Sequence, residues 1–340
     1  MSAPSSIPTT ARQFRLAAVP SGLPKESDFL LEQAALAAPQ PGEALVRTVY
    51  LSVDPYMRGR ITGVRTYADP VKVGDVMVGG AVGQVVESRD ANLLPGDFVA
   101  GYWGWRDHVV VPGEWLRKLD PKTAPVSTAL GVLGMPGMTA YFGFLEICQP
   151  KAGETVVVST AAGAVGSLVG QIAKIHGCRA IGIAGSDGKI RHIVDDLGFD
   201  AAFNYKTTSD YIAKLRELCP NGIDCYFDNV GGVVSDAVFT LLNPFGRVSV
   251  CGQISQYNMQ KPEPGPRLLG QILTKQLRVE GFIVTRFQDR WPQGIAQMAR
   301  WIQEGKLRYR EDIVEGFENT PRAFIDLLEG KNTGKMLVKA

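Results

Sequence analysis

The sequence predicts an α/β protein in which a doubly wound parallel sheet is joined to a barrel-like, β-rich domain. Two observations favour this fold. Between residues 153 and 251, apolar runs typical of buried strands alternate with helical patterns, as repeated βαβ units require. Before residue 130, short strand-like stretches are separated by Gly- and Pro-rich turns, as in small barrels. A chain of 340 residues is also long enough for two hydrophobic cores.

The β-rich region follows residues 1–12, a lead rich in Ser, Pro and Thr that we expect to be a loose end. Apolar and alternating stretches then predict strands at 14–17, 44–53, 76–88, 98–103 and 105–111. Glycines within 76–88 indicate a bent strand, as at the corner of a barrel.

The second region begins near residue 129 with helical patterns over 129–145, which we expect a turn at Pro136 and Gly137 to interrupt. Strands are predicted at 155–158, 179–184, 202–205, 223–228 and 246–251, with helices over 168–175, 189–197, 210–218 and 235–242. A strand at 277–284, a helix over 291–304 and a strand at 335–338 complete the chain. Because we expect the last strand to return to the β-rich domain, we assign residues 1–130 and 306–340 to one discontinuous domain and residues 131–305 to the other.

The balance of charges excludes two classes of partner. Lys and Arg total 36 against 34 for Asp and Glu, so the net charge of +2 gives no electrostatic basis for binding nucleic acid or an anionic membrane. The N-terminus lacks an apolar signal region, and no stretch approaches the roughly 20 apolar residues that a membrane helix needs. We therefore expect a cytoplasmic protein that acts on a small molecule.

The cysteines and histidines argue against a metal centre. Five cysteines are scattered without a Cys-x-x-Cys pair, and the chain has only three histidines. We expect reduced, mostly buried thiols and no metal.

A turn of small residues joins the strand at 155–158 to the helix that follows. It reads Ala-Ala-Gly-Ala-Val-Gly over 161–166, with alanine at Ala161, where the dinucleotide-binding fingerprint has its first glycine. Such a turn brings backbone N–H groups and a helix N-terminus against a diphosphate. By itself it also fits any strand-to-helix turn, but its place at the first crossover of a doubly wound (Rossmann) sheet favours a dinucleotide.

The choice between NAD and NADP depends on the end of the next strand, about 20 residues past Gly166. Ser186 occupies this strand end, and Lys189, with Arg191 and Lys206 nearby, provides positive charge. Because a 2′-phosphate requires cationic partners, these residues favour NADP. Asp187 is the complication, because it is either an NAD-type acid displaced by one position or the N-cap of the following helix.

Six motifs, spread over almost the whole chain, carry a resemblance to a known family. They are DPYMRGR at 54–60, GMPGMTAY at 134–141, AGAVG at 162–166, FNYK at 203–206, YFDNVGG at 226–232 and GFEN at 316–319. Together they resemble the zinc-independent medium-chain dehydrogenase/reductases, and within them the branch of leukotriene hydroxydehydrogenases, prostaglandin reductases, curcumin reductase and plant double-bond reductases. The cysteine and Gly-His-Glu motifs of the zinc alcohol dehydrogenases are replaced here by LSVD at 51–54 and VGGA at 78–81.

The resemblance implies an NADP-dependent oxidoreductase that acts on CH–CH groups. The implied reaction reduces the carbon–carbon double bond of α,β-unsaturated ketones and aldehydes by hydride transfer to the β-carbon. Quinone reduction, and NADPH binding without chemistry, remain as alternatives. The resemblance also implies that residues 131–305 bind NADP, that the β-rich domain is catalytic, and that the protein is a homodimer, for which the strand at 246–251 or at 277–284 offers a pairing edge.

The resemblance assigns the residues that would hold NADP. The diphosphate falls to Gly163, Ala164, Val165 and Gly166, and the 2′-phosphate region to Gly185, Lys189 and Tyr205. The nicotinamide and ribose side would be formed by Thr139, Asn229, Cys251, Gly252, Ile254, Ser255, Tyr257, Phe282, Ile283, Val284 and Asn332.

Two tyrosines are the candidate catalytic residues. Without a metal, the enolate oxygen that develops in such a reduction needs hydrogen-bond donors, and a phenol stays protonated at neutral pH. We expect Tyr257 to be this donor and to deliver the proton to the α-carbon, with water as the alternative source, and Tyr56 to be a second donor. Tyr56 is alternatively a packed aromatic residue, and Tyr257 a structural one. The proline-rich loop at 256–268 is either a wall of the substrate pocket or a surface linker.

Overall fold

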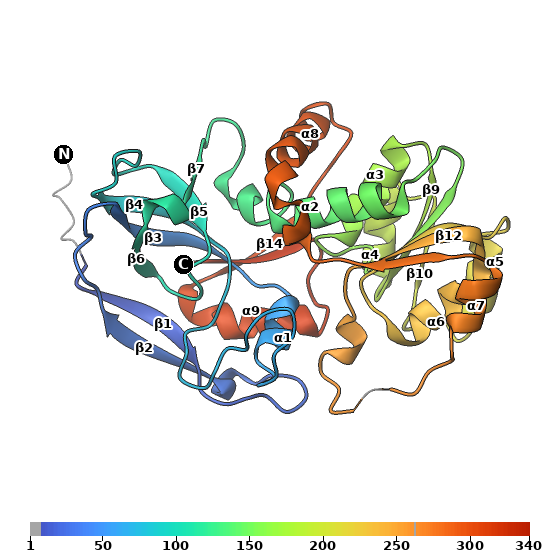
Figure 1. Ribbon diagram of the computed structural model, residues 1–340, viewed down its shortest axis with the longest axis horizontal. Helices are drawn as coiled ribbons and strands as arrows, with labels where there is room; N and C mark the ends of the chain where they lie inside the picture. Colours follow the sequence, from blue (N-terminus) through green and yellow to red (C-terminus); the bar gives the residue numbers. More distant parts are fainter. Residues whose placement is uncertain (1–7, 262) are drawn as a thin grey trace. The chain divides into compact units, whose positions relative to one another are not determined.

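A computed structural model describes residues 8–261 and 263–340, which fold as two compact units. The first unit extends to Leu130 and also contains Asp312–Lys331 and Met336–Ala340, and the second comprises Gly131–Glu311 and Asn332–Lys335. One unit is built on a largely antiparallel sheet and the other on a parallel sheet, which confirms the predicted fold class (Figure 1). Residues 1–7 of the expected loose end, and Pro262 of the proline-rich loop, lie outside the described residues.

The first unit contains a larger, largely antiparallel sheet and a two-stranded antiparallel sheet in its described residues. Its larger sheet has the order β14-β15-β3-β4-β5-β7, with β6 also paired to β3. These strands are β3 (Glu43–Ser52), β4 (Ala81–Ser88), β5 (Phe98–Gly101), β6 (His108–Pro112), β7 (Arg117–Leu119), β14 (Glu311–Glu315) and β15 (Lys335–Lys339). The closing strand therefore pairs with β3, with Leu337 opposite Ser52.

The smaller sheet pairs β1 (Thr10–Leu16) with β2 (Phe29–Ala35), from Thr10 opposite Ala35 to Leu16 opposite Phe29. The expected loose end is thus wrong from Thr10 onward, because the backbone there has a partner strand that the sequence pattern did not reveal. The expected strands at 76–88 and 98–103 are shortened to β4 and β5, and the strand expected at 105–111 begins later and ends one residue later, as β6.

Aromatic side chains form the core of the first unit. The Trp105 ring lies 5.3 Å from Phe29 and 5.9 Å from Phe324, measured between ring centroids. Phe324 belongs to α9 (Thr320–Leu328), and its ring centroid lies 6.2 Å from that of Phe29, so α9 packs against the β1–β2 pair. The short helix α1 (Tyr56–Arg60) contributes the fully buried Met57 to the same core.

The second unit is a parallel sheet with the strand order β10-β9-β8-β11-β12-β13 in the described chain. Its strands are β8 (Thr155–Ser159), β9 (Arg179–Ala184), β10 (Ala201–Asn204), β11 (Ile223–Asp228), β12 (Leu242–Val250) and β13 (Arg278–Gly281). The chain moves outward from β8 to β10 and then returns to β11 on the other side of β8. This reversal places a switch point at the carboxyl ends of β8 and β11, where open α/β sheets bind their ligands.

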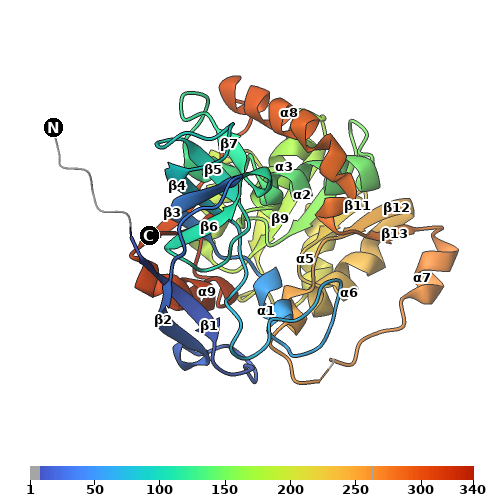
Figure 2. The same ribbon diagram turned by 60° about the vertical axis from the view of Figure 1, so that its left-hand side comes forward.

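Helices cover both faces of this sheet (Figures 1 and 2). On one face α2 (Met135–Phe142) packs against α3 (Gly166–Ile175) and α8 (Trp291–Gln303). On the other face α5 (Tyr211–Leu218) packs against α6 (Gly232–Leu241). The remaining helices of the unit are α4 (Asp187–Arg191) and α7 (Leu269–Thr274). Across the described residues, none of the helices combines the length and apolar character needed to cross a membrane.

Several predicted boundaries in the second unit are wrong for identifiable reasons. Pro136 and Gly137 lie inside the first turn of α2 rather than in a break, because a proline there loses no intrahelical hydrogen bond. The helix expected from 189 starts earlier, at Asp187, after its N-cap Ser186. The strand expected over 277–284 extends only through β13. The strand at 246–251 is not an edge, because β12 lies between β11 and β13.

Gly170 tests the packing of α3. A Cβ atom at this position would lie 1.8 Å from the ring of the buried Phe199. We expect Gly170→Ala to lower the free energy of unfolding by roughly 1–3 kcal/mol, because the core must shift to admit the methyl group.

The measurement is urea unfolding followed by circular dichroism. Gly270→Ala in α7 is the control, because a Cβ there meets no atom within 4 Å, and we expect it to be neutral or stabilising. Equal stabilities of the two variants would contradict the packing of α3 on Phe199.

Candidate functional site

A pair of hydrogen bonds joins the carboxyl ends of β8 and β11. The backbone N–H of Asn229 donates to Ser159 Oγ at 2.9 Å, and Asn229 Nδ2 donates to the Ser159 carbonyl at 2.7 Å. Ser159 is the last residue of β8, and Asn229 directly follows β11. The Asn229 side chain is therefore fixed at the switch point.

The predicted diphosphate turn follows Ser159. Thr160 adopts a positive φ of 52°, and its carbonyl accepts the Gly163 N–H at 2.9 Å. A Cβ on Gly166 would lie 2.3 Å from that carbonyl oxygen, so only glycine fits where α3 begins. Thr160, and not Ala161, carries the left-handed conformation, which explains why alanine is tolerated where the fingerprint has glycine.

A distant segment of the chain lies against this turn. The Gly334 N–H donates to the Ala162 carbonyl at 2.8 Å, and Gly334 forms a parallel bridge with Gly163. Asn332 is buried and donates from Nδ2 to the Gly334 carbonyl at 2.8 Å. The structure thus brings Asn332 close to the turn at Gly163.

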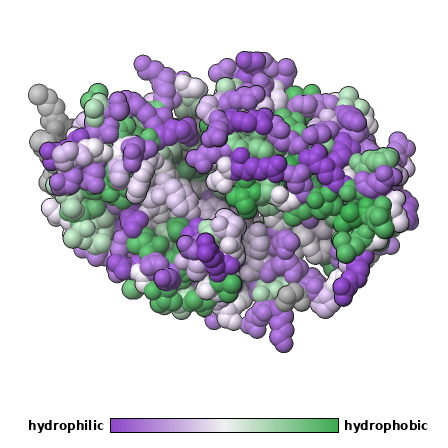
Figure 3. Space-filling view, in the orientation of Figure 1, coloured by the Kyte–Doolittle hydropathy of each residue, from purple (hydrophilic) through white to green (hydrophobic). Residues whose placement is uncertain are grey.

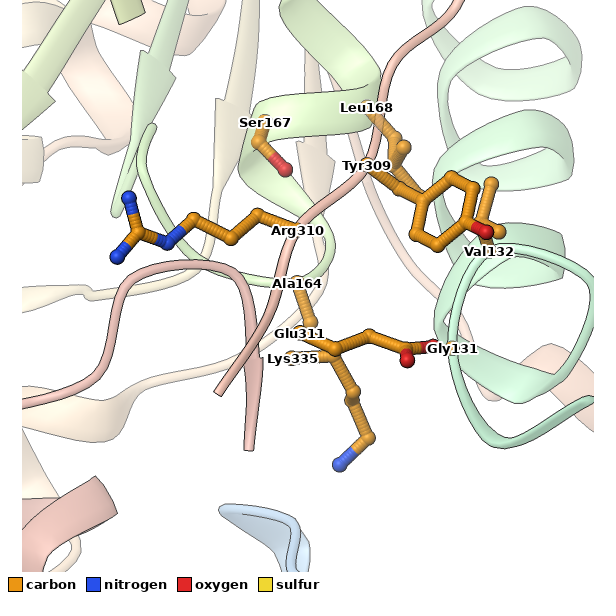
Figure 4. A pocket seen from close by; sticks show the side chains of 9 residues that line it. All are labelled: Gly131, Val132, Ala164, Ser167, Leu168, Tyr309, Arg310, Glu311 and Lys335. Atoms are coloured by element: carbon orange, nitrogen blue, oxygen red, sulfur yellow. The ribbon is translucent and has the colours of Figure 1, made fainter. Parts of the chain in front are cut away.

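The helix side of the turn encloses only a small pocket (Figure 4). Its volume of about 10 Å³ is at most the space of one water molecule, so neither a dinucleotide nor an organic substrate fits there. It is lined by Gly131, Val132, Ala164, Ser167, Leu168, Tyr309, Arg310, Glu311 and Lys335. Val165 precedes α3 as its N-cap residue.

The ends of β9 and β10 carry the candidate 2′-phosphate residues. The Tyr205 N–H donates to the Ala184 carbonyl at 3.0 Å, and the Tyr205 ring lies directly over Gly185, where a Cβ would be 3.0 Å from it. Ser186 caps α4 by accepting the Lys189 N–H at 3.3 Å. The structure therefore gathers Gly185, Lys189 and Tyr205 at one place.

The same geometry shows that Asp187 is not the N-cap of the following helix, which was one of its two interpretations. Because Ser186 is the N-cap, Asp187 is the first residue of α4 and not its cap. Its carboxylate instead accepts a hydrogen bond of 2.8 Å from Asn204 Nδ2.

Asp228 organises the opposite side of the switch point. Its buried carboxylate accepts hydrogen bonds from Ser235 Oγ at 2.6 Å and from the Tyr226 hydroxyl at 2.9 Å. It also accepts the N–H groups of Val230 and Gly231, each at 2.9 Å. Sequence reasoning did not assign Asp228 a role, although an acid that ends an apolar strand was the available signal.

The Asp228 backbone also fixes the segment after β12. Its carbonyl accepts the N–H groups of Cys251 at 2.8 Å and Gly252 at 3.1 Å. The Ile254 N–H then donates to the Asn229 carbonyl at 3.2 Å, and Ser255 Oγ donates to the Val230 carbonyl at 2.6 Å. Burial raises the pKa of Cys251 to about 12, so this thiol is not a nucleophile at neutral pH.

Tyr257 lies in this same segment. Its hydroxyl oxygen accepts the Gln253 N–H at 3.3 Å and would lie 3.1 Å from a Cβ built on Gly252. Burial raises the pKa of Tyr257 above its usual value, and the Gln253 hydrogen bond only partly opposes this shift. The phenol is therefore protonated at neutral pH, and its hydrogen remains available to donate.

Two other candidates, Thr139 and Phe282, have side chains that are engaged elsewhere. Thr139 Oγ1 donates to the Met135 carbonyl of its own helix at 2.8 Å. The Phe282 ring packs on Gly143, where a Cβ would be only 2.2 Å away. Ile283 is exposed, and Val284 is partly buried at the start of the next helical turn. If residues 282–284 contact a ligand, their backbone groups are the available donors and acceptors.

Tyr56 belongs to the first unit, where it both packs and forms a hydrogen bond. Its ring packs against the aromatic core, and its hydroxyl lies 3.0 Å from that of Tyr102. Burial, reinforced by the nearby Asp54 carboxylate, raises the pKa of Tyr56 well above its usual value. Tyr56 is thus a protonated phenol with a defined orientation.

Two family models match the chain, one for each part. The N-terminal domain of oxidoreductase matches residues 12–119, and a model described as zinc-binding dehydrogenase matches residues 164–300. Within the described ranges, no three His, Cys, Asp or Glu side chains come together as metal ligands.

Relatives with known names cover almost the whole chain. The NADPH-dependent curcumin reductase of Escherichia coli is 46% identical over 333 residues, which are 96% of each chain. Prostaglandin reductase 1 of Rattus norvegicus is 48% identical over 323 residues, 94% of this chain and 96% of that one. This chain belongs to the zinc-independent medium-chain dehydrogenase/reductases.

A solved structure of this family fixes the cofactor. The crystal structure of CurA from Vibrio vulnificus in complex with NADPH is similar with a TM-score of 0.93 and 48% identity, over 97% of this chain and 99% of that one. Together with the named relatives, it identifies this medium-chain reductase as an NADP-dependent oxidoreductase. The chain's own geometry fits the cofactor, because the turn of small residues leads directly into the N-terminus of α3, where backbone N–H groups can face a diphosphate.

Gly166 provides a test of the turn. We expect Gly166→Ala to weaken NADP⁺ binding at least about tenfold, because the added Cβ would lie only 2.3 Å from the Thr160 carbonyl oxygen, and relieving this clash must move the N–H groups of the turn. Isothermal titration calorimetry measures the affinity, and circular dichroism verifies the fold. Gly270→Ala is the control, and an unchanged affinity in Gly166→Ala would exclude the turn from the cofactor site.

Proposed function

We propose that this reductase reduces the carbon–carbon double bond of α,β-unsaturated ketones and aldehydes, with hydride transfer to the β-carbon. The observation that carries the proposal is the identity of 46–48%, over at least 94% of the chain, to enzymes named curcumin reductase and prostaglandin reductase 1. The protonated, oriented phenol of Tyr257 supports the same chemistry, because an enolate oxygen requires a hydrogen-bond donor.

The geometry of the second unit supports a proposed cofactor site. In our proposal Gly163, Ala164, Val165 and Gly166 bind the diphosphate through backbone N–H groups, and Gly185, Lys189 and Tyr205 surround the 2′-phosphate. Asn332, Asn229 and the segment from Cys251 to Tyr257 form the ribose and nicotinamide side, together with Thr139 and residues 282–284. When bound, NADPH supplies the hydride.

Tyr257 has the principal catalytic role in this proposal. The Gln253 N–H occupies one lone pair of its hydroxyl oxygen, which leaves the hydroxyl hydrogen directed elsewhere. That hydrogen stabilises the enolate oxygen as it forms and is the source of the proton that reaches the α-carbon. Tyr56, whose hydroxyl is held by Tyr102, is the second donor.

We also propose the wider organisation of the protein. Residues 131–305 are the NADP-binding domain, and residues 1–130 with 306–340 are the catalytic domain.

The protein is a cytoplasmic homodimer that pairs through β13, the edge strand of the described parallel sheet. Leu269 and Leu273 of the nearby α7 are each 77% exposed, and Figure 3 shows hydrophobic residues gathered on that side of the unit. Proline-stiffened residues 256–268, apart from the undescribed Pro262, form a wall of the substrate pocket.

A panel of substrates tests the reaction. We expect purified protein to oxidise NADPH with enones and enals, and to do so far more slowly with quinones or with NADH in place of NADPH. The decrease in NADPH absorbance measures the rate, and mass spectrometry of the saturated product identifies the reduced bond. Turnover of quinones alone would favour the quinone reductase function, and NADPH binding without turnover would contradict any enzymatic role.

Substitution of Tyr257 tests the donor. Tyr257→Phe removes only the hydroxyl, so we expect turnover of an enone to decrease at least tenfold, in line with the roughly 2.7–4 kcal/mol that one oxyanion donor contributes. NADPH affinity should remain near that of the wild type. Tyr141→Phe is the control, because Tyr141 packs against Phe142 and Trp301. Wild-type turnover in Tyr257→Phe would remove Tyr257 from the mechanism and leave water as the proton source.

A further inference from the structure

The proposed 2′-phosphate site contains an acid that conflicts with its ligand. Asp187 is exposed and lies two residues before Lys189. A carboxylate at the end of this strand is the group that NAD-dependent enzymes use to accept the ribose 2′-hydroxyl. Next to a dianionic phosphate the same carboxylate is repulsive. Since the protein uses NADP, Asp187 must be kept from accepting the 2′-hydroxyl of NAD and from repelling the 2′-phosphate of NADP.

Asn204 is the group that engages this acid. Its Nδ2 donates to Asp187 Oδ1 at 2.8 Å, across from the neighbouring strand. Asn204 ends β10 and pairs with Ala184 at the end of β9, so the two strand ends hold the amide beside α4.

The orientation of the Asn204 amide is itself fixed. Its Oδ1 accepts the Lys206 N–H at 3.0 Å, so Nδ2 has to face Asp187. The Asn204 carbonyl also accepts the N–H of Thr208 at 3.1 Å, which holds the backbone of this loop. Tyr205, the next residue, lies over Gly185. One short segment therefore restrains the carboxylate and also presents the phenol to the phosphate site.

We propose that Asn204 is a specificity-determining residue that selects NADP over NAD by restraining the Asp187 carboxylate. The amide occupies an oxygen that would otherwise accept the 2′-hydroxyl of NAD, and it holds the negative charge away from the 2′-phosphate. This inference rests on the assignment of the 2′-phosphate site to Lys189 and Tyr205, and it concerns only binding.

Calorimetric titration with NADP⁺, NAD⁺, 2′,5′-ADP and 5′-AMP tests the proposal without any turnover. We expect Asn204→Ala to reduce the preference for NADP⁺ over NAD⁺ about fivefold, the size of a partly exposed charge interaction of about 1 kcal/mol. The ratio of the affinity for 2′,5′-ADP to that for 5′-AMP should decrease by the same factor. These two ligands, like NADP⁺ and NAD⁺, differ only by the 2′-phosphate. The change should become smaller in high salt, since the interaction is between charges near solvent.

A double variant separates restraint of Asp187 from a structural effect. In the Asp187→Asn background the charge is absent, so Asn204→Ala should change the preference less than twofold. Asp187→Asn alone should also change it less than twofold, because the wild-type carboxylate is already restrained. Two results would overturn the proposal. One is a large increase in the preference for NADP⁺ over NAD⁺ with Asp187→Asn alone. The other is a loss of this preference that is equally large when Asn204→Ala is made in the wild-type and in the Asp187→Asn background.

Asn243→Ala is the matched control, because Asn243 Nδ2 makes the same kind of 2.8 Å bond to the Asp224 carboxylate, next to the start of β11. It should leave the preference unchanged. A wild-type protein without preference for NADP⁺ would overturn the site assignment, and the inference with it. A wild-type preference that persists in Asn204→Ala would overturn the inference about Asn204 alone. If Asn204→Ala does not fold, Asn204→Ser provides the same comparison.

Discussion

The burial of one carboxylate, that of Asp228, determines the arrangement around the switch point of the parallel sheet. A buried carboxylate is costly unless donors satisfy it, and here two hydroxyls and two backbone N–H groups do so. Those donors come from β11, from the turn after it and from α6, so satisfying Asp228 fixes the position of each. The backbone carbonyl of the same residue then holds Cys251 and Gly252. Through these bonds a single acid orders the segments that carry both Asn229 and Tyr257.

The diphosphate turn depends on a different constraint, which is the space around the Thr160 carbonyl. Thr160 accepts the strained left-handed conformation, and Gly166 lacks the Cβ that would strike its carbonyl oxygen. The departure from the usual fingerprint at Ala161 is therefore compatible with the function of the turn, because the position that needs conformational freedom has moved by one residue. The backbone conformation that such a motif must adopt is therefore a better criterion than the identity of each of its residues.

The two ends of the site differ in what holds them. Near Tyr257 several backbone hydrogen bonds join partly buried residues of two segments, so the geometry is specified by many contacts there. At the other end, Asp187 and its partner Asn204 are at or near the surface, where a hydrogen bond contributes less to stability. Such a bond can still decide which ligand binds, because specificity is a difference between two affinities rather than a total.

The sequence by itself determined the fold class, the paired strands and helices of the βαβ units, and the family. These features are local: the apolar period of β9 or β11 and the small residues at 161–166 are visible within one segment. One boundary failed because a tertiary contact overrides the local pattern, at Thr10, which pairs with an unpredicted strand. Another failed for a local reason, because Pro136 and Gly137 fit the first turn of a helix. Only the tertiary structure decided that Asn204 restrains Asp187, that Gly334 lies against Ala162, and that Asp228 joins three segments. Each of these contacts depends on which strands and loops become neighbours, and that choice is made by packing of the whole unit rather than by any one stretch of sequence.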